Sequence, residues 1–516
     1  MNTLSFLSIP AGIVPDQEAI ISEEQRFTYA DVLRRVHRLG GALASLGARR
    51  GTRVAALHTN SHRYVEAYYA TAMLGGIFVP MNYRAKGPEL EYMLAAAEAQ
   101  ILLVGERYFD GVCAVHPRVP TLRHVVGFNF AAAGCPDYET LVAGATEHES
   151  EADVDDADVS ILMFTSGTTQ LPKGVMLTYA DFTAYVTANV ELADGTPRGA
   201  ALLCAPLYHI AGATNMMTTL WTGRRLVIMP QFEPRGWLDL VERERVTHAF
   251  VVPTMMKHLL DQPDLERYDL SSLEVLAYGG ASMPLAVIRR AIGRFPSSVG
   301  FVNAFGQTET TSTLTLLGPE DHRLVGTAEE IERRTRRLTS IGRPLPDVEA
   351  RIVDDHGREV APREVGEIHV RTPRIMKGYA GATDSVLTAD GWLPTRDMGW
   401  MDEDGYLYVA GRKDDMIIRG GENIAPAEVE SVLLSHPGLE EAAVVGIPDV
   451  EWGQRVAAFV VPRPGVSVSA EELSEFCRQR LSSFKKPEWF HFLTELPKNP
   501  MGKILRRELR ARLDAS

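Results

Sequence analysis

The sequence contains few cysteines and no long apolar run. Four cysteines are spread over 516 residues without a C-x-x-C pair, which indicates free thiols in a reducing compartment rather than a disulfide framework. No apolar stretch approaches the ~20 residues that a membrane-spanning helix needs, and the first residues lack the basic and apolar regions of a secretory signal. We therefore expect a soluble, cytoplasmic protein without a transmembrane segment.

An excess of positive charge is also absent. The formal net charge is −14 at pH 7, from 53 Lys and Arg residues against 67 Asp and Glu residues. Nucleic-acid binding requires a basic surface, so nucleic acid is not expected as a partner. The hydrophobic content of 45% and the charged content of 23% are typical of a globular protein. A chain of this length is expected to form several packed subdomains.

Apolar runs of strand composition alternate with segments of helical periodicity in the first part of the chain. Strands are expected at 53–57, 77–80 and 101–104, and helices at 64–74 and 89–97. Such alternation predicts an α/β fold with a largely parallel sheet, because each crossover helix returns the chain to the same edge.

A β-rich section begins at Ser340, with strands expected near 349–353 and 366–371. The segment that follows it is long enough for a small unit with its own core. The sequence therefore predicts a large N-terminal domain of parallel-sheet α/β subdomains with a β-rich subdomain, and a small C-terminal α+β domain.

A polar segment that contains glycine follows an apolar run near the middle of the N-terminal part. Residues 159–164, VSILMF, predict a buried strand, and TSGTTQLPKGV at 165–175 comes directly after it. Glycines let backbone N–H groups approach phosphate oxygens, hydroxyls add donors, and Lys173 would neutralise charge. The segment is not a Walker A loop, because Lys173 precedes Gly174 and no hydroxyl follows. We interpret it as a phosphate-binding loop.

This segment resembles the phosphate loop of the acyl-adenylate-forming enzymes, which include acyl-CoA synthetases, firefly luciferase and peptide-synthetase adenylation domains. The family's common loop has a glycine where this chain has Gln170. The run NAFGQTE at 303–309 matches the family's second strong motif. Further matches lie in the family's order between Thr165 and Lys503, so the resemblance covers essentially the whole chain.

The resemblance implies a nucleotide site. Asn303 would bond the adenine amine, Phe305 would stack on the ring, and Asp397 would accept from the ribose hydroxyls. Arg412 matches an arginine that contacts ribose and phosphate. The residues expected to bind ATP or AMP are Thr165, Ser166, Gly167, Thr168, Thr169, Gly279, Gly280, Ala281, Asn303, Ala304, Phe305, Gly306, Asp397 and Arg412.

The resemblance also implies catalytic groups. Lys503 matches the family's catalytic lysine, and Lys173 would add positive charge at the triphosphate. Thr308 would contact the α-phosphate. Glu309 would hold Mg²⁺, a hard cation that prefers oxygen ligands, and Thr168 is also assigned to the metal.

Two short segments are expected to line a pocket for the acid. The residues assigned to it are His209, Ile210, Gly212 and Thr310. Amino-acid-activating relatives carry an Asp that pairs the substrate amine, whereas residues 209–212 offer no carboxylate. An amino acid substrate is therefore disfavoured. Small residues in this segment and at 310–314 indicate room for an aryl or a medium- to long-chain alkyl group.

The small domain is expected to move. By resemblance it comprises residues 414–516, the large domain comprises residues 1–413, and the chain rotates about the hinge residue Asp414. The rotation would withdraw Lys503 from the nucleotide.

A coenzyme A site is expected on the small domain. Gly420 and Gly421 would line a tunnel that only a thin thiol arm can enter, because side chains are absent there. Trp452 and Lys486 would contact the adenine and the diphosphate of coenzyme A.

The resemblance implies an AMP-forming carboxylate–CoA ligase that uses ATP, Mg²⁺ and coenzyme A. It would adenylate a medium- or long-chain fatty acid or an aryl acid and then form a thioester. Alternatives are an enzyme that loads the pantetheine of a carrier protein, a luciferase-like oxidoreductase, and a nucleotide-binding regulator without turnover. The sequence leaves open which acid is used and whether the chain forms a homodimer.

Overall fold

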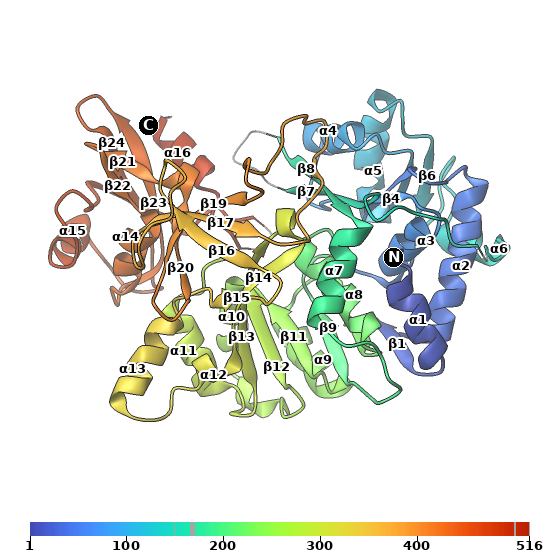
Figure 1. Cartoon of the computed structure of the whole chain (residues 1–516), viewed down its shortest axis with the longest axis horizontal. Coiled ribbons are helices and arrows are strands. Elements are labelled where there is room, and N and C mark those ends of the chain that lie inside the picture. Colours follow the sequence, from blue (N-terminus) through green and yellow to red (C-terminus); the bar gives the residue numbers. More distant parts are fainter. Residues whose placement is uncertain (149, 166–170, 500–501, 515–516) are drawn as a thin grey trace.

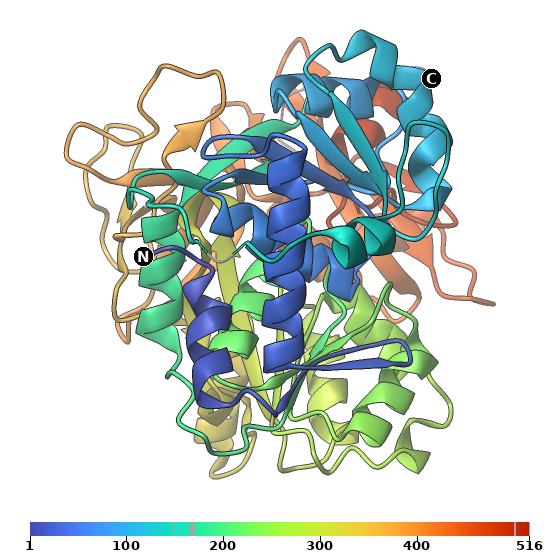
Figure 2. The same ribbon diagram turned by 90° about the vertical axis from the view of Figure 1, so that its right-hand side faces the viewer.

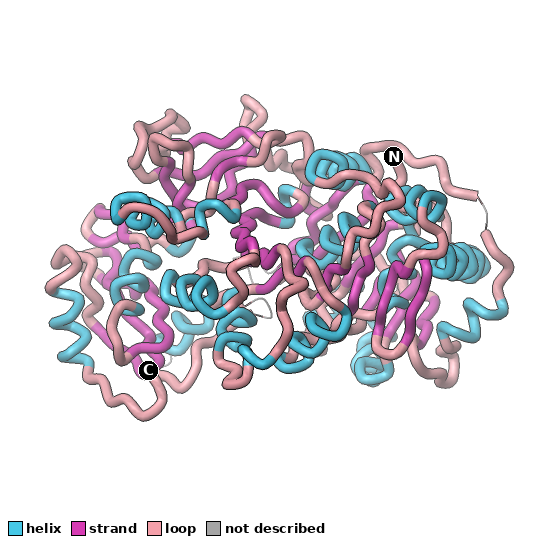
Figure 3. Tube along the Cα trace, turned by 90° about the horizontal axis from the view of Figure 1, so that it is seen from below, coloured by secondary structure: helices cyan, strands magenta, loops and turns pink. Residues whose placement is uncertain are grey.

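The computed structural model describes the chain except residues 149, 166–170, 500–501 and 515–516. Within these described ranges the strands form four sheets. The two larger sheets and their helices make up most of the molecule, and an antiparallel sheet lies between them and the C-terminal unit (Figure 1). Figure 3 shows the two chain ends far apart. In Figure 1 the C-terminal strands and helices, drawn in orange to red, gather at one end of the molecule.

One large sheet is parallel through most of its width. Its edges are antiparallel, because β2 pairs β1 and β14 pairs β13 in hairpins. In spatial order its strands are β15 (Arg343–Pro344), β14 (Ser312–Leu317), β13 (Gly300–Gln307), β12 (Val275–Gly279), β11 (His248–Val251), β9 (Ala200–Leu203), β10 (Arg225–Ile228), β1 (Glu18–Ser22) and β2 (Gln25–Thr28).

The other large sheet has the same character. Parallel pairing joins its strands from β7 to β6. β7 and β8, which flank the predicted phosphate loop in the sequence, form an antiparallel hairpin. In spatial order its strands are β18 (Gly378–Tyr379), β8 (Lys173–Thr178), β7 (Val159–Thr165), β4 (Ile77–Pro80), β3 (Arg53–Leu57), β5 (Ile101–Val104) and β6 (His124–Gly127).

Helices fill the space between the two large sheets and cover their outer faces. One apolar cluster joins side chains of the middle helices to strands of both sheets, for example Val65, Phe78 and Leu226. Figure 2 shows α1 and α2 side by side in this middle layer. Its helices are α1 (Ser5–Ile13), α2 (Tyr29–Ser45), α3 (His62–Met73), α6 (Tyr138–Gly144), α7 (Tyr179–Asn189) and α8 (Ile210–Trp221).

Separate clusters cover the outer faces, through Trp237 and Ile288 on the first sheet and Leu90 and Val112 on the second. The outer helices are α4 (Pro88–Ala96), α5 (Glu106–Val115), α9 (Pro234–Glu244), α10 (Pro253–Leu260) and α11 (Leu285–Arg294), with α12 (Pro319–His322) and α13 (Ala328–Arg337) beyond β13.

A capping box fixes the exit from the phosphate-loop hairpin. The Thr178 side chain accepts from the Asp181 N–H at 3.2 Å, and the Asp181 carboxylate accepts from the Thr178 N–H at 2.7 Å. This reciprocal pair satisfies amide groups that the first turn of α7 would otherwise leave unbonded. Strand β8 therefore passes directly into α7, and the hairpin is held at its base.

The antiparallel sheet and the C-terminal unit complete the fold. The antiparallel sheet has the order β16 (Glu349–Val353), β17 (Gly366–Arg371), β19 (Leu393–Met401) and β20 (Leu407–Arg412). The C-terminal sheet has the order β22 (Glu422–Ile424), β21 (Ile417–Arg419), β24 (Gly453–Pro462) and β23 (Leu439–Asp449), with β25 (Trp489–Phe492) beside β24. Its helices are α14 (Pro426–Leu434), α15 (Ala470–Arg478) and α16 (Arg506–Asp514).

Among the residues that the structure describes, every helix is too short or too polar to cross a lipid bilayer.

Candidate active site

A buried carboxylate lies at the centre of the site. Asp397 on β19 is 4% exposed and faces Arg412 across the β19–β20 ladder. The Arg412 Nε lies 2.9 Å from Asp397 Oδ1, and the Gln307 Nε2 donates to Asp397 Oδ2 at 2.7 Å. Burial raises the pKa of Asp397, while Arg412 and Gln307 oppose this change. These partners fix the direction of the carboxylate that the sequence assigns to the ribose.

Lys503 comes from the far end of the chain to the same place. Asp397 and Arg412 are among its electrostatic neighbours, and burial lowers the pKa of Lys503. The Arg412 charge lowers the pKa further, whereas Asp397 and Asp415 raise it. The Lys503 N–H donates to Asn499 Oδ1 at 2.9 Å. Because Lys503 is buried, its charge is poorly solvated and would attract an anion bound in this site more strongly than an exposed lysine would.

Contacts between the small and large domains hold Lys503 there. The Lys257 Nζ on α10 lies 2.5 Å from the Oε1 of Glu440, near the start of β23 in the C-terminal sheet. Gly502 packs on the beginning of α10, where an added Cβ would come within 2.8 Å of the Thr254 Oγ1. In the structure the small domain is therefore oriented so that Lys503 lies near Asp397 and Arg412 of the large domain.

A tyrosine links Glu309 to Lys173. The Tyr379 hydroxyl donates to Glu309 Oε1 at 2.9 Å, and the Lys173 Nζ lies 5.1 Å from the centre of the Tyr379 ring. Burial raises the pKa of Tyr379, and Glu309 adds to this effect, so the hydroxyl stays a donor. β18 pairs β8 with Tyr379 opposite Val175, which brings the tyrosine to the phosphate-loop hairpin. At the other side of that hairpin Thr165 Oγ1 lies 3.5 Å from the Lys173 carbonyl.

Glu309 suits the expected magnesium ion. Its Oε1 accepts from Tyr379, which leaves Oε2 as a hard oxygen ligand. The described residues hold no cluster of three or more His, Cys, Asp or Glu side chains around a common point. Mg²⁺ commonly takes one or two protein carboxylates together with substrate phosphates. The donor set therefore fits an ion that arrives with a triphosphate.

A strained turn follows Glu309. Thr308 and Thr310 are buried, and Thr311 and Ser312 have left-handed φ values of 50° and 86°. Arg374, which is fully buried, donates from Nη1 to the Thr310 carbonyl at 2.9 Å. The Thr311 hydroxyl donates to the Arg374 carbonyl at 3.0 Å. Non-glycine residues hold such a conformation only where the surroundings fix it.

The predicted acyl-pocket segments lie next to each other. His209 caps α8, and burial lowers its pKa to about 4, so the imidazole is neutral at pH 7. From α8 the Thr214 hydroxyl donates to Ser312 Oγ at 3.1 Å, which joins this helix to the turn after Thr310. Ile210 and Gly212 occupy the first turn of α8, and Gly212 packs against the Pro206 carbonyl with no room for a Cβ.

The predicted adenine residues Asn303 and Phe305 lie on β13, beside the end of β12. The Asn303 Nδ2 donates to the Ser340 carbonyl at 3.2 Å. The Asn303 Oδ1 is the side-chain atom that could accept from an amine. An added Cβ at Gly279 would come within 2.1 Å of the Ala304 carbonyl, so only glycine fits. The ring of Phe305 packs against the core of the antiparallel sheet. Gly306 is on β13, and Gly280, with a φ of 78°, and Ala281 follow β12.

The predicted coenzyme A residues cluster on the small domain. Gly420 and Gly421 have φ values of 58° and 87° in the β21–β22 turn. The Trp452 ring covers Gly420, and the Gly420 N–H donates to the Trp452 carbonyl at 2.8 Å. Lys486 lies two residues after Phe484, and the Phe484 carbonyl accepts from the Arg419 Nη1 at 3.0 Å.

Several residues of the site are not assigned a role from the sequence. Some of the residues that are assigned a role lie outside the described ranges. Gln307, Tyr379 and Arg374 hold the predicted groups in place, but only Gln307 lies in a quoted motif. Their roles depend on contacts between residues far apart in the chain, which local patterns do not carry. The predicted phosphate-loop residues Ser166, Gly167, Thr168 and Thr169 lie outside the described residues.

Lys173, Glu309, Asp397 and Lys503 are thus connected. Lys173 and Glu309 both contact Tyr379. Glu309 is an electrostatic neighbour of Asp397, and Asp397 is one of Lys503.

Comparison with known families gives two matches, one in the N-terminal part of the chain and one in the C-terminal part. Residues 11–380 match the family of AMP-binding enzymes, and residues 428–503 match the C-terminal domain of AMP-binding enzymes. This chain belongs to the AMP-binding enzymes. The predicted membership of the acyl-adenylate-forming enzymes is confirmed.

Relatives of this AMP-binding enzyme match it over nearly their whole lengths. The fatty acid–[acyl-carrier-protein] ligase ScoC of Streptomyces coeruleorubidus is 34% identical, over 96% of this chain and 94% of the relative. The feruloyl-CoA synthase of an Amycolatopsis species is 36% identical, over 97% of each. The anthranilate CoA ligase AuaEII in complex with anthranoyl-AMP superimposes with a TM-score of 0.89 at 27% identity, over 100% of this chain and 98% of that chain. The predicted fold class is confirmed.

Proposed function

We propose that this AMP-binding enzyme activates a carboxylic acid with ATP and transfers the acyl group to the thiol of coenzyme A. The prediction of an AMP-forming acid–thiol ligase is confirmed for the reaction class by its relatives. The observation that carries the residue assignment is the meeting of Lys503, from the small domain, with Asp397 and Arg412 of the large domain.

In the first half-reaction the substrate carboxylate attacks the α-phosphorus of ATP and pyrophosphate leaves, which gives an acyl-adenylate. Both reactants are anions, so the site must offset their repulsion. We assign this role to Lys503 and Lys173, with Thr308 at the α-phosphate. Asp397 would orient the ribose, and Arg412 would contact ribose and phosphate. Mg²⁺ held by Glu309 and substrate oxygens would neutralise further negative charge when bound.

In the second half-reaction the thiol sulfur attacks the acyl carbonyl carbon and AMP leaves with the electrons of the broken acyl–phosphate bond. We assign the change between the steps to a rotation of residues 414–516 on residues 1–413 about Asp414. The rotation would remove Lys503 from the site and bring Gly420 and Gly421 to it. Trp452 and Lys486 would then contact coenzyme A.

We assign the acid to an aryl or a medium- to long-chain alkyl class. His209 is neutral at pH 7, because burial lowers its pKa to about 4, and so supplies no positive charge for a second carboxylate. Apolar and small side chains continue along α8 beyond Gly212. ATP and coenzyme A are both available in the cytoplasm, which is the location that we propose.

Isotope exchange tests the first half-reaction. The purified chain is incubated with ATP, Mg²⁺, labelled pyrophosphate and a panel of aliphatic and aryl acids, and label in ATP is measured. We expect exchange with at least one acid of the proposed class and, after coenzyme A is added, release of AMP with formation of a thioester. Exchange with no acid on the panel would overturn the proposal.

A carrier protein is the second candidate acceptor. ScoC, which is 34% identical over 96% of this chain, is named as a ligase for an acyl carrier protein. The same acyl-adenylate is offered to coenzyme A or to a phosphopantetheinylated carrier protein in separate reactions. Faster thioester formation on coenzyme A supports the first proposal, and acyl transfer to the carrier alone supports the second.

A further inference from the structure

Arg396 has an unusual backbone for its position. It lies on β19 between Thr395 and the ribose carboxylate Asp397, and its φ is 61°. Residues with a Cβ avoid this left-handed region, because the Cβ approaches the following carbonyl oxygen. Strain of this kind persists where other contacts fix the residue.

Arg396 is held in this conformation by an ion pair with Asp414, the predicted hinge residue. The Arg396 Nε donates to Asp414 Oδ2 at 3.1 Å, and its Nη2 pairs the other carboxylate oxygen, Oδ1. Asp414 is the middle residue of the short 3₁₀ turn η4 (Lys413–Asp415), which connects β20 to the small domain. A bidentate pair fixes orientation as well as distance. Arg396 therefore sets the direction of Asp414.

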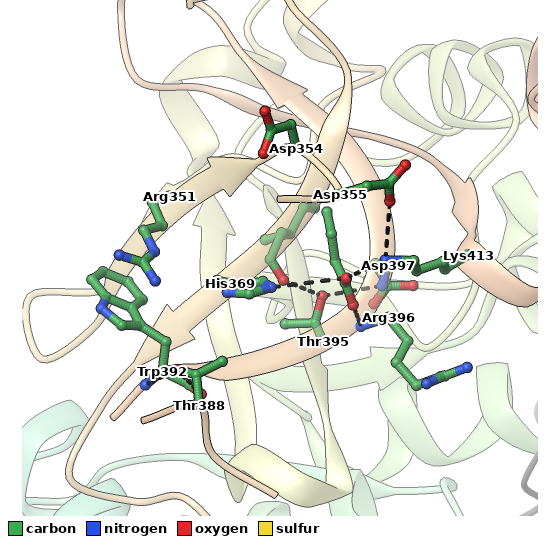
Figure 4. Close-up of polar contacts among 12 residues, drawn as sticks. Arg351, Asp354, Asp355, His369, Thr388, Trp392, Thr395, Arg396, Asp397 and Lys413 are labelled. Carbon is green, nitrogen blue, oxygen red and sulfur yellow. Dashed lines mark hydrogen bonds and ion pairs between the residues drawn. The ribbon is translucent and has the colours of Figure 1, made fainter. Parts of the chain in front are cut away.

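A second set of contacts anchors the residue before the hinge. The Lys413 Nζ lies 2.9 Å from Glu367 Oε2. It also lies 3.4 Å from Asp355 Oδ1 (Figure 4). The other oxygen of this carboxylate, Glu367 Oε1, accepts from the Arg396 N–H at 3.2 Å. Glu367 thus ties the backbone of Arg396 and the side chain of Lys413 to the antiparallel sheet.

We propose that Arg396 is a positioning residue that latches the hinge in the orientation with Lys503 at the nucleotide. This rests on the proposed rotation about Asp414. Arg396 belongs to the large domain and Asp414 begins the small one, so a change of the hinge torsions breaks their pair. The pair therefore stabilises the adenylating orientation and is lost in the thiol-accepting one.

The latch should affect the ratio of the adenylation rate to the thiol-transfer rate. If each half-reaction proceeds from one orientation, the ratio of their rates follows the ratio of the two populations. Arg396 is 57% exposed and Asp414 29% exposed, and pairs of this exposure are modest in strength. We expect loss of the pair to lower the ratio of adenylation to thiol transfer about threefold to fivefold.

Arg396→Gly is the test variant, because glycine accepts the left-handed φ and the fold keeps its backbone. Adenylation is measured as pyrophosphate exchange and thiol transfer as thioester formation from supplied acyl-AMP. The matched control is Arg363→Gly. Arg363 also has a left-handed φ, of 70°, and pairs Glu403 Oε2 at 2.9 Å, away from the hinge.

We expect Arg396→Gly to lower the ratio and Arg363→Gly to leave it unchanged. Arg396→Lys, which keeps the charge without the bidentate geometry, should recover part of the ratio. An unchanged ratio in Arg396→Gly, or an equal change in Arg363→Gly, would overturn the latch. Failure of the proposed function is a separate result, since the unaltered chain would then show no exchange with any acid.

Discussion

Replacing Arg374 by methionine should destabilise the protein and slow adenylation together. The Arg374 side chain is fully buried, and its Nε and Nη2 lie 2.6 Å and 3.2 Å from the Asp347 oxygens. Its Nη1 also satisfies the Thr310 carbonyl. Breaking a buried ion pair by removing one partner typically costs about 3–5 kcal/mol, because the other charge stays behind. Asp347 is 17% exposed, so we expect about 3 kcal/mol.

The loss of Arg374 should also change the position of Glu309, the carboxylate that we propose holds Mg²⁺. Arg374 holds the turn at Thr311 and Ser312, whose φ values of 50° and 86° are unfavourable for residues with a Cβ. This turn directly follows Glu309 and Thr310. When Arg374 no longer fixes it, Glu309 should lose its alignment with Tyr379, and pyrophosphate exchange should fall even in the fraction that stays folded.

Urea unfolding measures the stability, and exchange at a temperature below the transition measures adenylation. Arg374→Met with Asp347→Asn removes both charges and should recover about half of the lost stability. Arg371→Met is the control, since Arg371 on β17 pairs Glu349 on β16 and both side chains are exposed, and its unfolding midpoint should equal that of the unaltered protein. A single variant as stable as the control, or a double variant no better than the single, would refute the reasoning.

Further expectations concern Lys503, the proposed catalytic lysine, and Gly421, which is proposed to line the thiol entrance. Lys503→Ala should lower pyrophosphate exchange by about 10²–10³ while thioester formation from supplied acyl-AMP stays near normal, and equal losses in both would contradict the division of roles. Burial lowers the pKa of Lys503. As the pH rises, kcat/KM for exchange should therefore begin to fall at a lower pH than the pKa of an exposed lysine would predict. Lys503→Arg should not show this alkaline loss, because arginine keeps its charge. Gly421 has a φ of 87°, and Gly421→Leu should slow thiol transfer more than exchange; unimpaired thioester turnover would remove this glycine from the entrance.

Local pattern in the sequence already contains the element order and the residue types of the site. Alternation of apolar runs and helical periodicity predicts the parallel sheets, and the observed β3, β4 and β5 fall at the expected positions 53–57, 77–80 and 101–104. The motif around Glu309 and the segments ending at Asp397 and Lys503 are also readable, because each occupies a short run of consecutive residues. Family membership follows from these runs and is confirmed.

Tertiary structure alone decides which of these groups meet and what holds them. Tyr379 reaches Glu309 across 70 positions of the chain, and Gln307 reaches Asp397 across 90. Arg396 and the predicted hinge residue Asp414 are brought together by the pairing of β19 with β20. Such contacts arise from the register of strands and the packing of separate subdomains, which no local periodicity encodes. Short-range chemistry therefore set the kinds of group in the site, and long-range packing set their distances, burial and charge.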